Sequence, residues 1–143
     1  YTLRNIDQDY ITISEGIDFT RVYVSLLNLR CNDKIILELE DEKVNGRDKI
    51  LAQSLQLLLE NVVKHNSPQE NDHLHIRLSV RNNMLVIKNN RIYAHGHKDH
   101  IIESYGIGLK NLKQRYELEC GKKIGYSVTD GYFEIRLPII KKQ

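Results

Sequence analysis

The sequence predicts an α+β protein, in which helices cover one face of a mixed, largely antiparallel sheet as a two-layer α/β sandwich. Several short segments alternate apolar and polar residues, which is the period of a strand. Three longer segments carry apolar residues at helical spacing. The strands follow one another in pairs across short turns instead of alternating singly with helices, and this order favours antiparallel pairing.

The amino-terminal part is predicted to hold one long helix followed by one strand. Residues 1–11 form a short segment of mixed polar and apolar composition, and we interpret it as the end of an upstream helix. Thr12 and Glu15 have the spacing of a capping box, which predicts a helix from there to about Arg30. Residues 35–39 then alternate as a strand with one mostly wet face.

The second predicted helix runs from about Asp48 to Asn66, and Ser67-Pro68 ends it. Its apolar side chains recur one turn apart and therefore face the core. They are Leu51, Leu55, Leu58, Leu59 and Val62.

The second half is predicted to hold two hairpins and a third helix. Residues 74–81 and 84–88 are strands joined at Asn82-Asn83, and residues 124–129 and 132–137 flank the turn dipeptide Asp130-Gly131. Between the hairpins, the polar stretch 89–105 has no periodicity, which is typical of a functional loop. A helix follows to about Glu119, with Leu109, Leu112 and Tyr116 on one face and Gly121 as its stop.

Composition narrows the class of protein. The chain has 143 residues and a formal net charge of +2, which indicates one domain and gives no reason to expect nucleic acid as a partner. No run of 18 apolar residues exists, so this fragment is not expected to contact a membrane. The chain lacks an initiator methionine, and we therefore treat it as part of a longer protein. Cys31 and Cys120 lack metal-site spacing and suggest a reducing cytoplasm.

One polar cluster lies at the border of the second helix's apolar stripe. Helical spacing places Asn61, Lys64 and His65 on the same face, where a cleft would form. An asparagine oxygen suits Mg²⁺, which takes few protein ligands besides water and phosphate oxygens. Lys64 and His65 could pair with those phosphates. The alternative is a solvated helix face.

A second cluster is the segment Gly106-Ile107-Gly108-Leu109, interpreted as a glycine turn that opens the third helix. Paired glycines let the backbone approach an anion, and helix-terminal amides favour negative charge. Asn111 and Arg115 lie one turn apart on the same helix. Taken alone, such glycines often mark an ordinary turn, but together the two clusters predict a site for ATP and Mg²⁺.

The order of these motifs resembles a known family. Leu58-Leu59-Glu60-Asn61-x-x-Lys64-His65, a strand ending in Asn89-Asn90, and Gly106-Ile107-Gly108-Leu109-x-Asn111-x-x-x-Arg115 are similar to the ATP-binding (HATPase-type, Bergerat-fold) domain of sensor histidine kinases, within the GHKL superfamily. The similarity is greatest to the LytS/YesM-like group, and a softer match covers the amino-terminal segment. The resemblance implies that residues 1–31 are the end of the dimerisation region with its connecting helix, and that residues 32–143 are the ATP-binding domain.

The resemblance also implies roles for individual residues. Asn61 would be the Mg²⁺ ligand, and Lys64 and His65 would contact phosphate. Gly106 and Gly108 would lie under the phosphates with Asn111 nearby. The ATP-binding set is completed by Asn89, Asn90, Ile107, Leu109 and Arg115, and residues 91–105 would form a lid over the nucleotide.

Three positions depart from the family pattern. Asn89 replaces the aspartate that accepts a hydrogen bond from the adenine amino group, although an amide oxygen can also accept it. Arg91 stands where a glycine is expected. Leu57 stands where hydrolysing relatives carry a glutamate, which favours transfer to a protein acceptor over hydrolysis. Glu60 could assist an acceptor histidine as a catalytic carboxylate, or could simply be solvated.

The resemblance implies a two-component sensor histidine kinase that transfers the ATP γ-phosphoryl group to a histidine upstream of this fragment, so the fragment is not expected to autophosphorylate alone. The whole protein would be a bacterial inner-membrane homodimer with this domain in the cytoplasm, and its partner would be a response regulator. Two alternatives stay open. One is a degenerate, non-catalytic nucleotide- or partner-binding module. The other is a metal- or partner-binding scaffold that uses His95, His97 and His100, which are otherwise interpreted as mobile lid residues.

Overall fold

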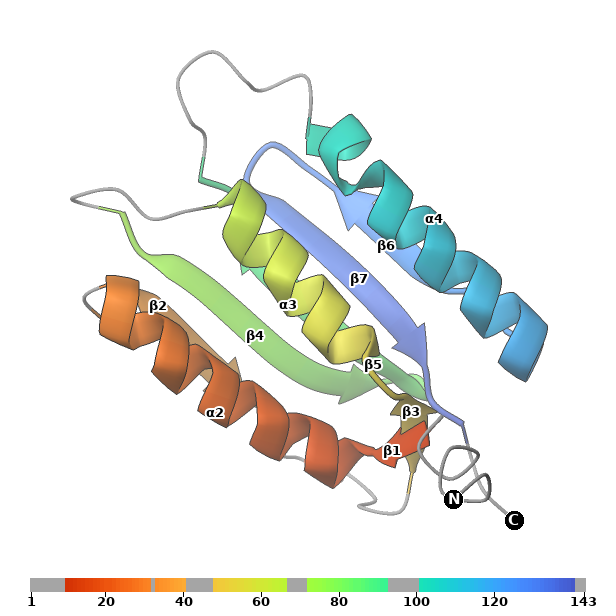
Figure 1. Cartoon of the computed structure of the whole chain (residues 1–143). Helices are drawn as coiled ribbons and strands as arrows, with labels where there is room; N and C mark the ends of the chain where they lie inside the picture. Colours follow the sequence, from red (N-terminus) through yellow and green to blue (C-terminus); the bar gives the residue numbers. More distant parts are fainter. Residues whose placement is uncertain (1–9, 32, 41–47, 67–71, 93–100, 141–143) are drawn as a thin grey trace.

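A computed structural model describes residues 10–31, 33–40, 48–66, 72–92 and 101–140, and gives only the backbone for residues 31, 65 and 101–108. Ten elements follow one another in the order β1 (Tyr10–Thr12), α2 (Ile13–Cys31), β2 (Ile35–Leu39), β3 (Lys49–Leu51), α3 (Ser54–His65), β4 (Leu74–Arg81), β5 (Met84–Asn90), α4 (Ile101–Cys120), β6 (Gly125–Val128) and β7 (Tyr132–Pro138) (Figure 1).

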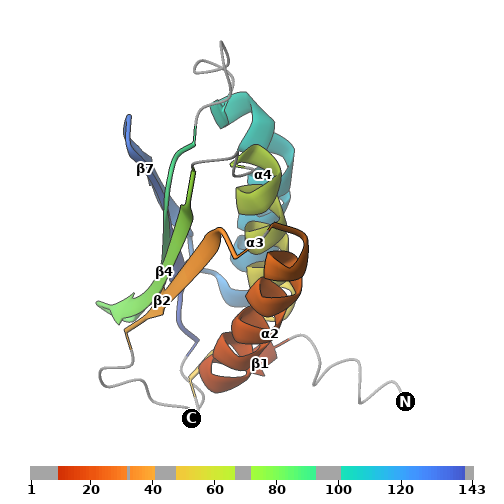
Figure 2. The same cartoon turned by 90° about the vertical axis from the view of Figure 1, so that its left-hand side faces the viewer.

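The predicted two-layer sandwich is confirmed. Five strands form one sheet in the order β2-β4-β5-β7-β6, in which only β2 and β4 pair in parallel. The three described helices lie on one side of this sheet, as the edge-on view in Figure 2 shows. A separate two-stranded ribbon pairs β1 with β3. Within the part of the chain that the structure describes, no helix is long and apolar enough to cross a membrane.

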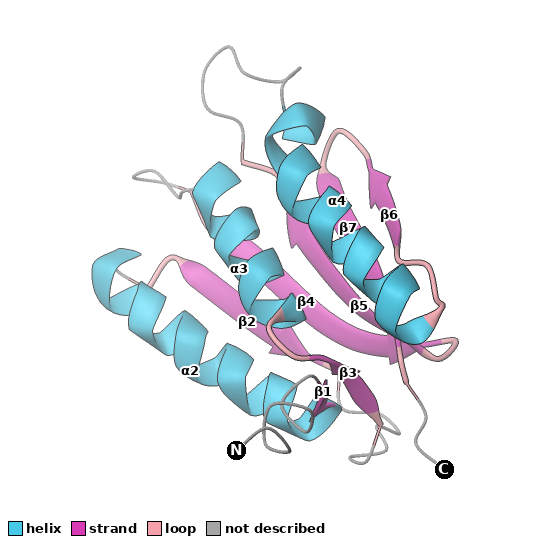
Figure 3. Ribbon diagram, turned by 45° about the vertical axis from the view of Figure 1, so that its right-hand side comes forward, coloured by secondary structure: helices cyan, strands magenta, loops and turns pink. Residues whose placement is uncertain are grey.

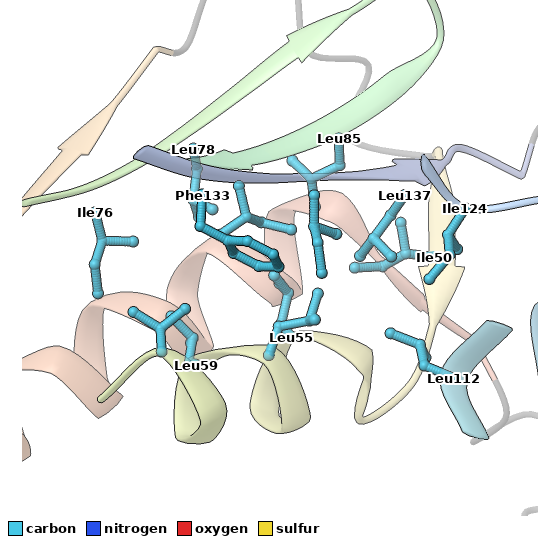
Figure 4. Close-up of a cluster of buried hydrophobic side chains, with 14 of the residues drawn as sticks. Ile50, Leu55, Leu59, Ile76, Leu78, Leu85, Leu112, Ile124, Phe133 and Leu137 are labelled. Carbon is cyan, nitrogen blue, oxygen red and sulfur yellow. The ribbon is translucent and has the colours of Figure 1, made fainter. Parts of the chain in front are cut away.

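The core lies between the helical layer and the sheet (Figure 4). From α3, Leu55 and Leu59 point toward the sheet, where Ile76 and Phe133 meet them. All five residues of the predicted α3 stripe are buried, and so are Leu109, Leu112 and Tyr116 of α4. Burial of such side chains stabilises the fold by about 1.5–3 kcal/mol each. The apolar periodicity therefore identified the core correctly.

Both predicted helix-end signals on α2 and α4 are present. The Thr12 backbone nitrogen donates to Glu15 Oε1 at 2.9 Å, while Thr12 Oγ1 accepts from the Glu15 nitrogen at 3.1 Å, so the capping box is complete. At the end of α4, Gly121 has a φ of 64° and its nitrogen donates to the Glu117 carbonyl at 3.0 Å. This left-handed conformation favours glycine and ends the helix there.

Two boundaries in the amino-terminal half differ from the prediction. Tyr10 and Ile11 belong to a strand and not to the end of a helix, and α3 begins at Ser54 and not near Asp48. The reason is tertiary pairing: Ile11 is the register partner of Ile50, so residues 49–51 are drawn into β3. Gln53 then turns the chain with a φ of 67°, and α3 starts after it.

The third helix also starts earlier than predicted. It begins at Ile101, so Gly106 and Gly108 lie inside α4 and do not open it. A glycine within a helix costs only about 1 kcal/mol relative to alanine, and the run from Ile101 to Tyr105 can carry the helix up to both glycines. The expectation of free helix-terminal amides at this pair is therefore wrong for this structure.

Both predicted hairpins are present. Asn82 and Asn83, with φ values of 53° and 60°, join β4 to β5, and β5 runs two residues further than predicted, to Asn90. Two positive φ angles in a two-residue loop are typical of the type I′ turn, whose twist matches that of the strands. The second hairpin joins β6 to β7 through Asp130-Gly131. The turn at Asn82-Asn83 sets the register that brings Asn89 to the far end of the sheet.

Candidate functional site

Three segments that are distant in the sequence meet at one end of the molecule. They are the carboxyl end of α3, the carboxyl end of β5 and the amino end of α4 (Figures 1 and 3). The helices α3 and α4 lie side by side over the sheet. Both predicted motif clusters therefore lie at the same end of the fold and on the same side of the sheet, as a shared ligand site requires.

Asn61 lies on the flank of α3 that faces α4. The opposite flank faces α2, because Gln56 lines one small apolar pocket together with Phe19 of α2. Helical geometry places Asn61 about 220° around the axis from Gln56 when counted through the buried stripe, so the two side chains border that stripe on opposite sides. The half-buried Asn61 side chain thus lies beside the buried stripe, on the flank of α3 away from α2.

The nitrogen of the Asn61 amide has no partner in the part of the chain that the structure describes. This Nδ2 atom is buried. Leaving a buried amide donor unpaired costs about 1–3 kcal/mol, so proteins rarely keep such a group without a use for it. A phosphate oxygen would satisfy this donor, and the oxygen of the same amide is the type of ligand that Mg²⁺ takes.

Asn89 presents the second unpaired group. It is only 1% exposed, and its Nδ2 donates to the carbonyl of Asn90 at 2.9 Å. Its Oδ1 is buried and has no partner among the described residues. The amide thereby uses one of its two donor hydrogens and leaves its acceptor available. Such an acceptor suits a ligand amino group.

Sequence reasoning missed Asn66, which builds the wall between these groups. Asn66 is 1% exposed; its Nδ2 donates to the Val62 carbonyl and its Oδ1 accepts from the Ile92 nitrogen, both at 2.9 Å. One side chain thus ends α3 and holds the segment that leaves β5. An asparagine directly after a helix is the signal that could have identified it, since short amides often bond to nearby backbone at helix ends.

Asn90 does not join the other predicted residues. Asn89 and Asn90 are consecutive in a strand, so their side chains point to opposite faces of the sheet. The Asn90 side chain bonds to the start of β4: it accepts from the His75 nitrogen at 2.6 Å and donates to the His73 carbonyl at 2.9 Å. Only its backbone carbonyl serves the site, by holding Asn89. The alternation Leu85, Ile87, Asn89 along β5 could have predicted this orientation.

On α4, three predicted ligands have other surroundings. Leu109 is buried in the core, so its side chain fixes α4 to the sheet. Asn111 is exposed. Arg115 lies about 10 Å further along the axis than Gly108, and its Nε is 3.8 Å from Glu119 Oε1, one turn still further on. The structure therefore does not bring Arg115 to the end of the fold where Asn61 lies.

The charged residues of α3 lie at its exposed surface. Glu60 accepts a hydrogen bond from Gln56 Nε2 at 3.1 Å, and Lys64 is exposed. Burial raises the pKa of Tyr23 on α2, and the negative charge of Glu60 raises it further, which places that carboxylate on the α2 side of α3. Glu60 thus faces away from the flank that carries Asn61. Leu57 is half-buried beside Asn61, and its side chain cannot act as a base.

Some predicted residues lie outside what the structure describes. These are the histidines 95, 97 and 100 and most of the predicted lid. For His65, Gly106, Ile107 and Gly108, only the backbone is described. At the exit of β5, Arg91 is tied to the β6–β7 hairpin: its nitrogen donates to the Gly131 carbonyl at 2.9 Å and its guanidinium bonds to the Thr129 carbonyl. Among the described residues, no three histidine, cysteine, aspartate or glutamate side chains gather as a metal site.

Comparison with known proteins places this geometry in context. No protein-family profile matches the chain. The sensor protein kinase HptS of Staphylococcus aureus is 31% identical over 88 residues, which is 61% of this chain and 17% of HptS, so the chain spans about a sixth of the length of that relative. The solved catalytic domain of the histidine kinase ThkA superposes with a TM-score of 0.55 at 17% identity, over 90% of this chain and 94% of that one.

The chain has the fold of a histidine kinase catalytic domain. The cytoplasmic segment of the histidine kinase QseC agrees, with a TM-score of 0.54 at 16% identity over 90% of this chain and 75% of that one. The Acinetobacter baumannii histidine kinase AdeS gives 0.50 at 15% identity over 91% and 66%. The α+β fold class predicted from the sequence is thus confirmed, and it is that of histidine kinase catalytic domains. In this chain, α3, β5 and α4 surround the candidate site.

Proposed function

We propose that this chain is the ATP-binding catalytic domain of a two-component sensor histidine kinase, which transfers the γ-phosphoryl group of Mg·ATP to a histidine outside this chain. The observation that carries the proposal is a pair of buried amide atoms without a partner among the described residues, Nδ2 of Asn61 and Oδ1 of Asn89. They come from different elements at the same end of the fold. One suits a phosphate and its metal, and the other suits an adenine amino group.

The chemistry required of the domain is positioning and charge neutralisation, because phosphoryl transfer needs little covalent help from the protein. Asn61 would orient the triphosphate and offer its oxygen to Mg²⁺. Mg²⁺, when bound, neutralises phosphate charge. Lys64 and His65, at the end of the same helix, are proposed to contact phosphate oxygens. Leu57 cannot activate water, which favours transfer over hydrolysis.

Base recognition is proposed to depend on Asn89. One of its two donor hydrogens is taken by the Asn90 carbonyl, and its acceptor has no partner among the described residues. Adenine presents an amino group at the position where guanine presents a carbonyl. We therefore expect ATP to bind more tightly than GTP, even though asparagine replaces the usual aspartate. The remaining proposed contacts are the close approach that Gly106 and Gly108 allow along the surface of α4, with Ile107 between them and Asn111 at the exposed edge.

The finer features of the whole protein are proposals of the same kind. They are membership of the LytS/YesM-like group, a homodimeric full-length protein anchored in the bacterial inner membrane, a cytoplasmic catalytic domain and a response regulator as partner. The boundary near residue 31 is also proposed. In its support, α2 has the position of a connecting helix that docks on the domain, since Ile13, Val24 and Leu27 share the core with the sheet.

Calorimetric titration of the chain with Mg·ATP tests the proposal. We expect saturable binding with a dissociation constant below about 1 mM, weakened about tenfold or more by Asn61→Ala. Lys64→Ala should also weaken it, whereas Lys113→Ala, which removes an equal charge from the exposed surface of α4, should not. Absence of binding by the folded chain would favour the degenerate module that Asn89 and Arg91 also allow.

A further inference from the structure

The face of the sheet that the described helices leave uncovered carries a pocket of its own. Its volume is about 320 Å³, at the lower end of the range for small-molecule sites. Figure 2 shows this face opposite the helical layer. The residues that line the pocket are almost all polar: Glu38, His75, Arg77, Lys88, Asn89, Asn90 and Tyr132. The pocket is thus separate from the space between α3 and α4.

Two cations stand directly opposite each other at this pocket. Arg77 of β4 and Lys88 of β5 are register partners in an antiparallel pair, so both side chains rise from the same face of the sheet. Like charges in such a pair are destabilising. An anion between them would relieve the repulsion and accept hydrogen bonds from both.

Each cation is held in place by a contact on its far side. Arg77 binds Glu38 of β2 at 3.0 Å and Glu40, the residue after β2, at 3.4 Å. The Lys88 Nζ lies 4.5 Å from the centre of the Tyr132 ring, a cation–π contact. The partners of Arg77 thus lie toward β2 and that of Lys88 lies on β7.

The acidic neighbour of Lys88 on β7 is otherwise engaged. Glu134 is its register partner on β7, yet Glu134 binds Arg136 at 2.7 Å and Arg81 at 3.6 Å. No ion pair joins Lys88 to an acid among the described residues. The lining holds two cations, Arg77 and Lys88, and one acid, Glu38; Arg77 also pairs with Glu40 outside the lining, so Lys88 is the cation of the pocket that has no carboxylate partner among the described residues.

One side chain of the lining is fixed by the fold. Asn90 makes two hydrogen bonds to the start of β4, so its amide is ordered before a ligand arrives. At the rim, His75 Nδ1 is 3.9 Å from Glu38 Oε1.

We propose that this pocket binds a small molecule with a carboxylate or phosphate group, held between Arg77 and Lys88. Glu38 accepts a hydroxyl or amino donor of the same molecule and disfavours larger polyanions. The proposal does not depend on the nucleotide site, because Arg77, Lys88 and Glu38 lie on the uncovered face of the sheet; Asn89, whose side chain points to the helices, is the one lining residue that the two sites share.

Calorimetric titrations of the whole chain with inorganic phosphate and with malonate test it, at an ionic strength fixed with sodium chloride. We expect saturable binding of at least one of the two, and the one that binds identifies the acidic group. Arg77→Gln and Lys88→Met should each weaken binding about tenfold or more, since each removes a charge-assisted hydrogen bond. Lys113→Met on α4 is the matched control and should change nothing. Asn61→Ala should also leave this binding intact, which separates it from any anion held at the nucleotide site.

Stability without ligand gives an independent readout. Removing one of two facing cations should raise the melting temperature of Lys88→Met or leave it unchanged, whereas a structural lysine would lower it. Amide chemical-shift mapping on the wild-type chain should place the anion at residues 75–77 and 88–90. The proposal is overturned if neither anion binds saturably, if Lys113→Met weakens binding as much as Lys88→Met, or if the shifts map to α3 and α4.

Discussion

The Asn66 Oδ1 atom lies 2.9 Å from the backbone nitrogen of Ile92 and accepts its hydrogen bond, which joins the end of α3 to the segment that leaves β5. Because Asn66 also caps Val62 through its Nδ2, one buried side chain holds both walls of the candidate site. A single amide thus links α3 directly to the segment that leaves β5 at this end of the fold.

Asn66→Ala should therefore be costly. It leaves the Ile92 nitrogen and the Val62 carbonyl without this partner, at about 1–3 kcal/mol for each buried group left unpaired. Urea unfolding should show a lower midpoint with an unchanged slope. The exposed Asn111→Ala is the control for stability and should stay within about 0.5 kcal/mol of the wild type. Equal midpoints for Asn66→Ala and the wild type would contradict the role assigned to Asn66.

Asn89→Leu should separate function from stability. The substitution removes a buried acceptor that has no partner among the described residues, and replaces it with an apolar side chain of similar size. Since only the bond to the Asn90 carbonyl is lost, the unfolding free energy should change by no more than about 1 kcal/mol in either direction. Mg·ATP binding should fall about tenfold or more.

The comparison that decides this case is Asn89→Leu measured with ATP and with GTP. Loss of ATP binding without loss of folding supports base recognition by Asn89. If ATP affinity survives in a folded Asn89→Leu chain, the residue has no part in base recognition.

The capping box predicts how α2 responds to acid. Hydrogen bonds from the Thr12 backbone and hydroxyl lower the pKa of the Glu15 carboxyl below its ordinary value. A lowered pKa in the folded state means that the carboxylate stabilises the fold at neutral pH, and that this contribution is lost as the pH falls through the folded pKa. Glu15→Gln should flatten the acid limb of a plot of melting temperature against pH. An acid limb identical to that of the wild type would show that the capping box does not contribute.

The buried Tyr116 predicts how stability changes at alkaline pH. Its hydroxyl accepts from the Leu51 nitrogen at 3.3 Å, and burial raises its pKa well above the ordinary value of 10.0. A raised pKa means that the neutral phenol stabilises the fold below about pH 10, and that this contribution is lost as the pH rises further. Tyr116→Phe should cost about 1–2 kcal/mol at neutral pH and should weaken the alkaline loss of stability. Parallel alkaline limbs for the two proteins would assign that loss to other groups.

Gln53 offers a stabilising substitution. Its φ of 67° lies in the left-handed region, where a side chain is strained and glycine is not. Gln53→Gly should raise stability by up to about 1 kcal/mol, and the gain should appear as a higher melting temperature. Ala52→Gly, one residue earlier, is the control and should not stabilise.

The apolar periodicity predicted the layers and most elements, because buried side chains impose their spacing on the sequence. Pairing between distant segments could not be read in this way. Residues 49–51 belong to β3 because Ile50 meets Ile11, which lies 39 positions earlier and whose partner no local pattern reveals. For the same reason, the strand order that makes β2 parallel to β4 was not predictable from local patterns.

The candidate site divides in a similar way. Asn61 and Asn89 were found because the motif spacing points to them, and their burial is consistent with the roles proposed for them. Asn90 was included by adjacency, although the period of two along β5 sends its side chain to the other face. The cation pair of Arg77 and Lys88 was not predicted at all, because it exists only once the β4–β5 register is known.

The turn at Asn82-Asn83 sets which side chains of β5 face the helices and which lie on the uncovered face of the sheet. Inserting or deleting a single amino acid there would shift the pairing by one position and send every β5 side chain through the sheet. Lys88 would then stand under the helices, and Asn89 would face solvent on the side that now holds the cations. We expect this loop to accept changes of chemistry far more readily than changes of length.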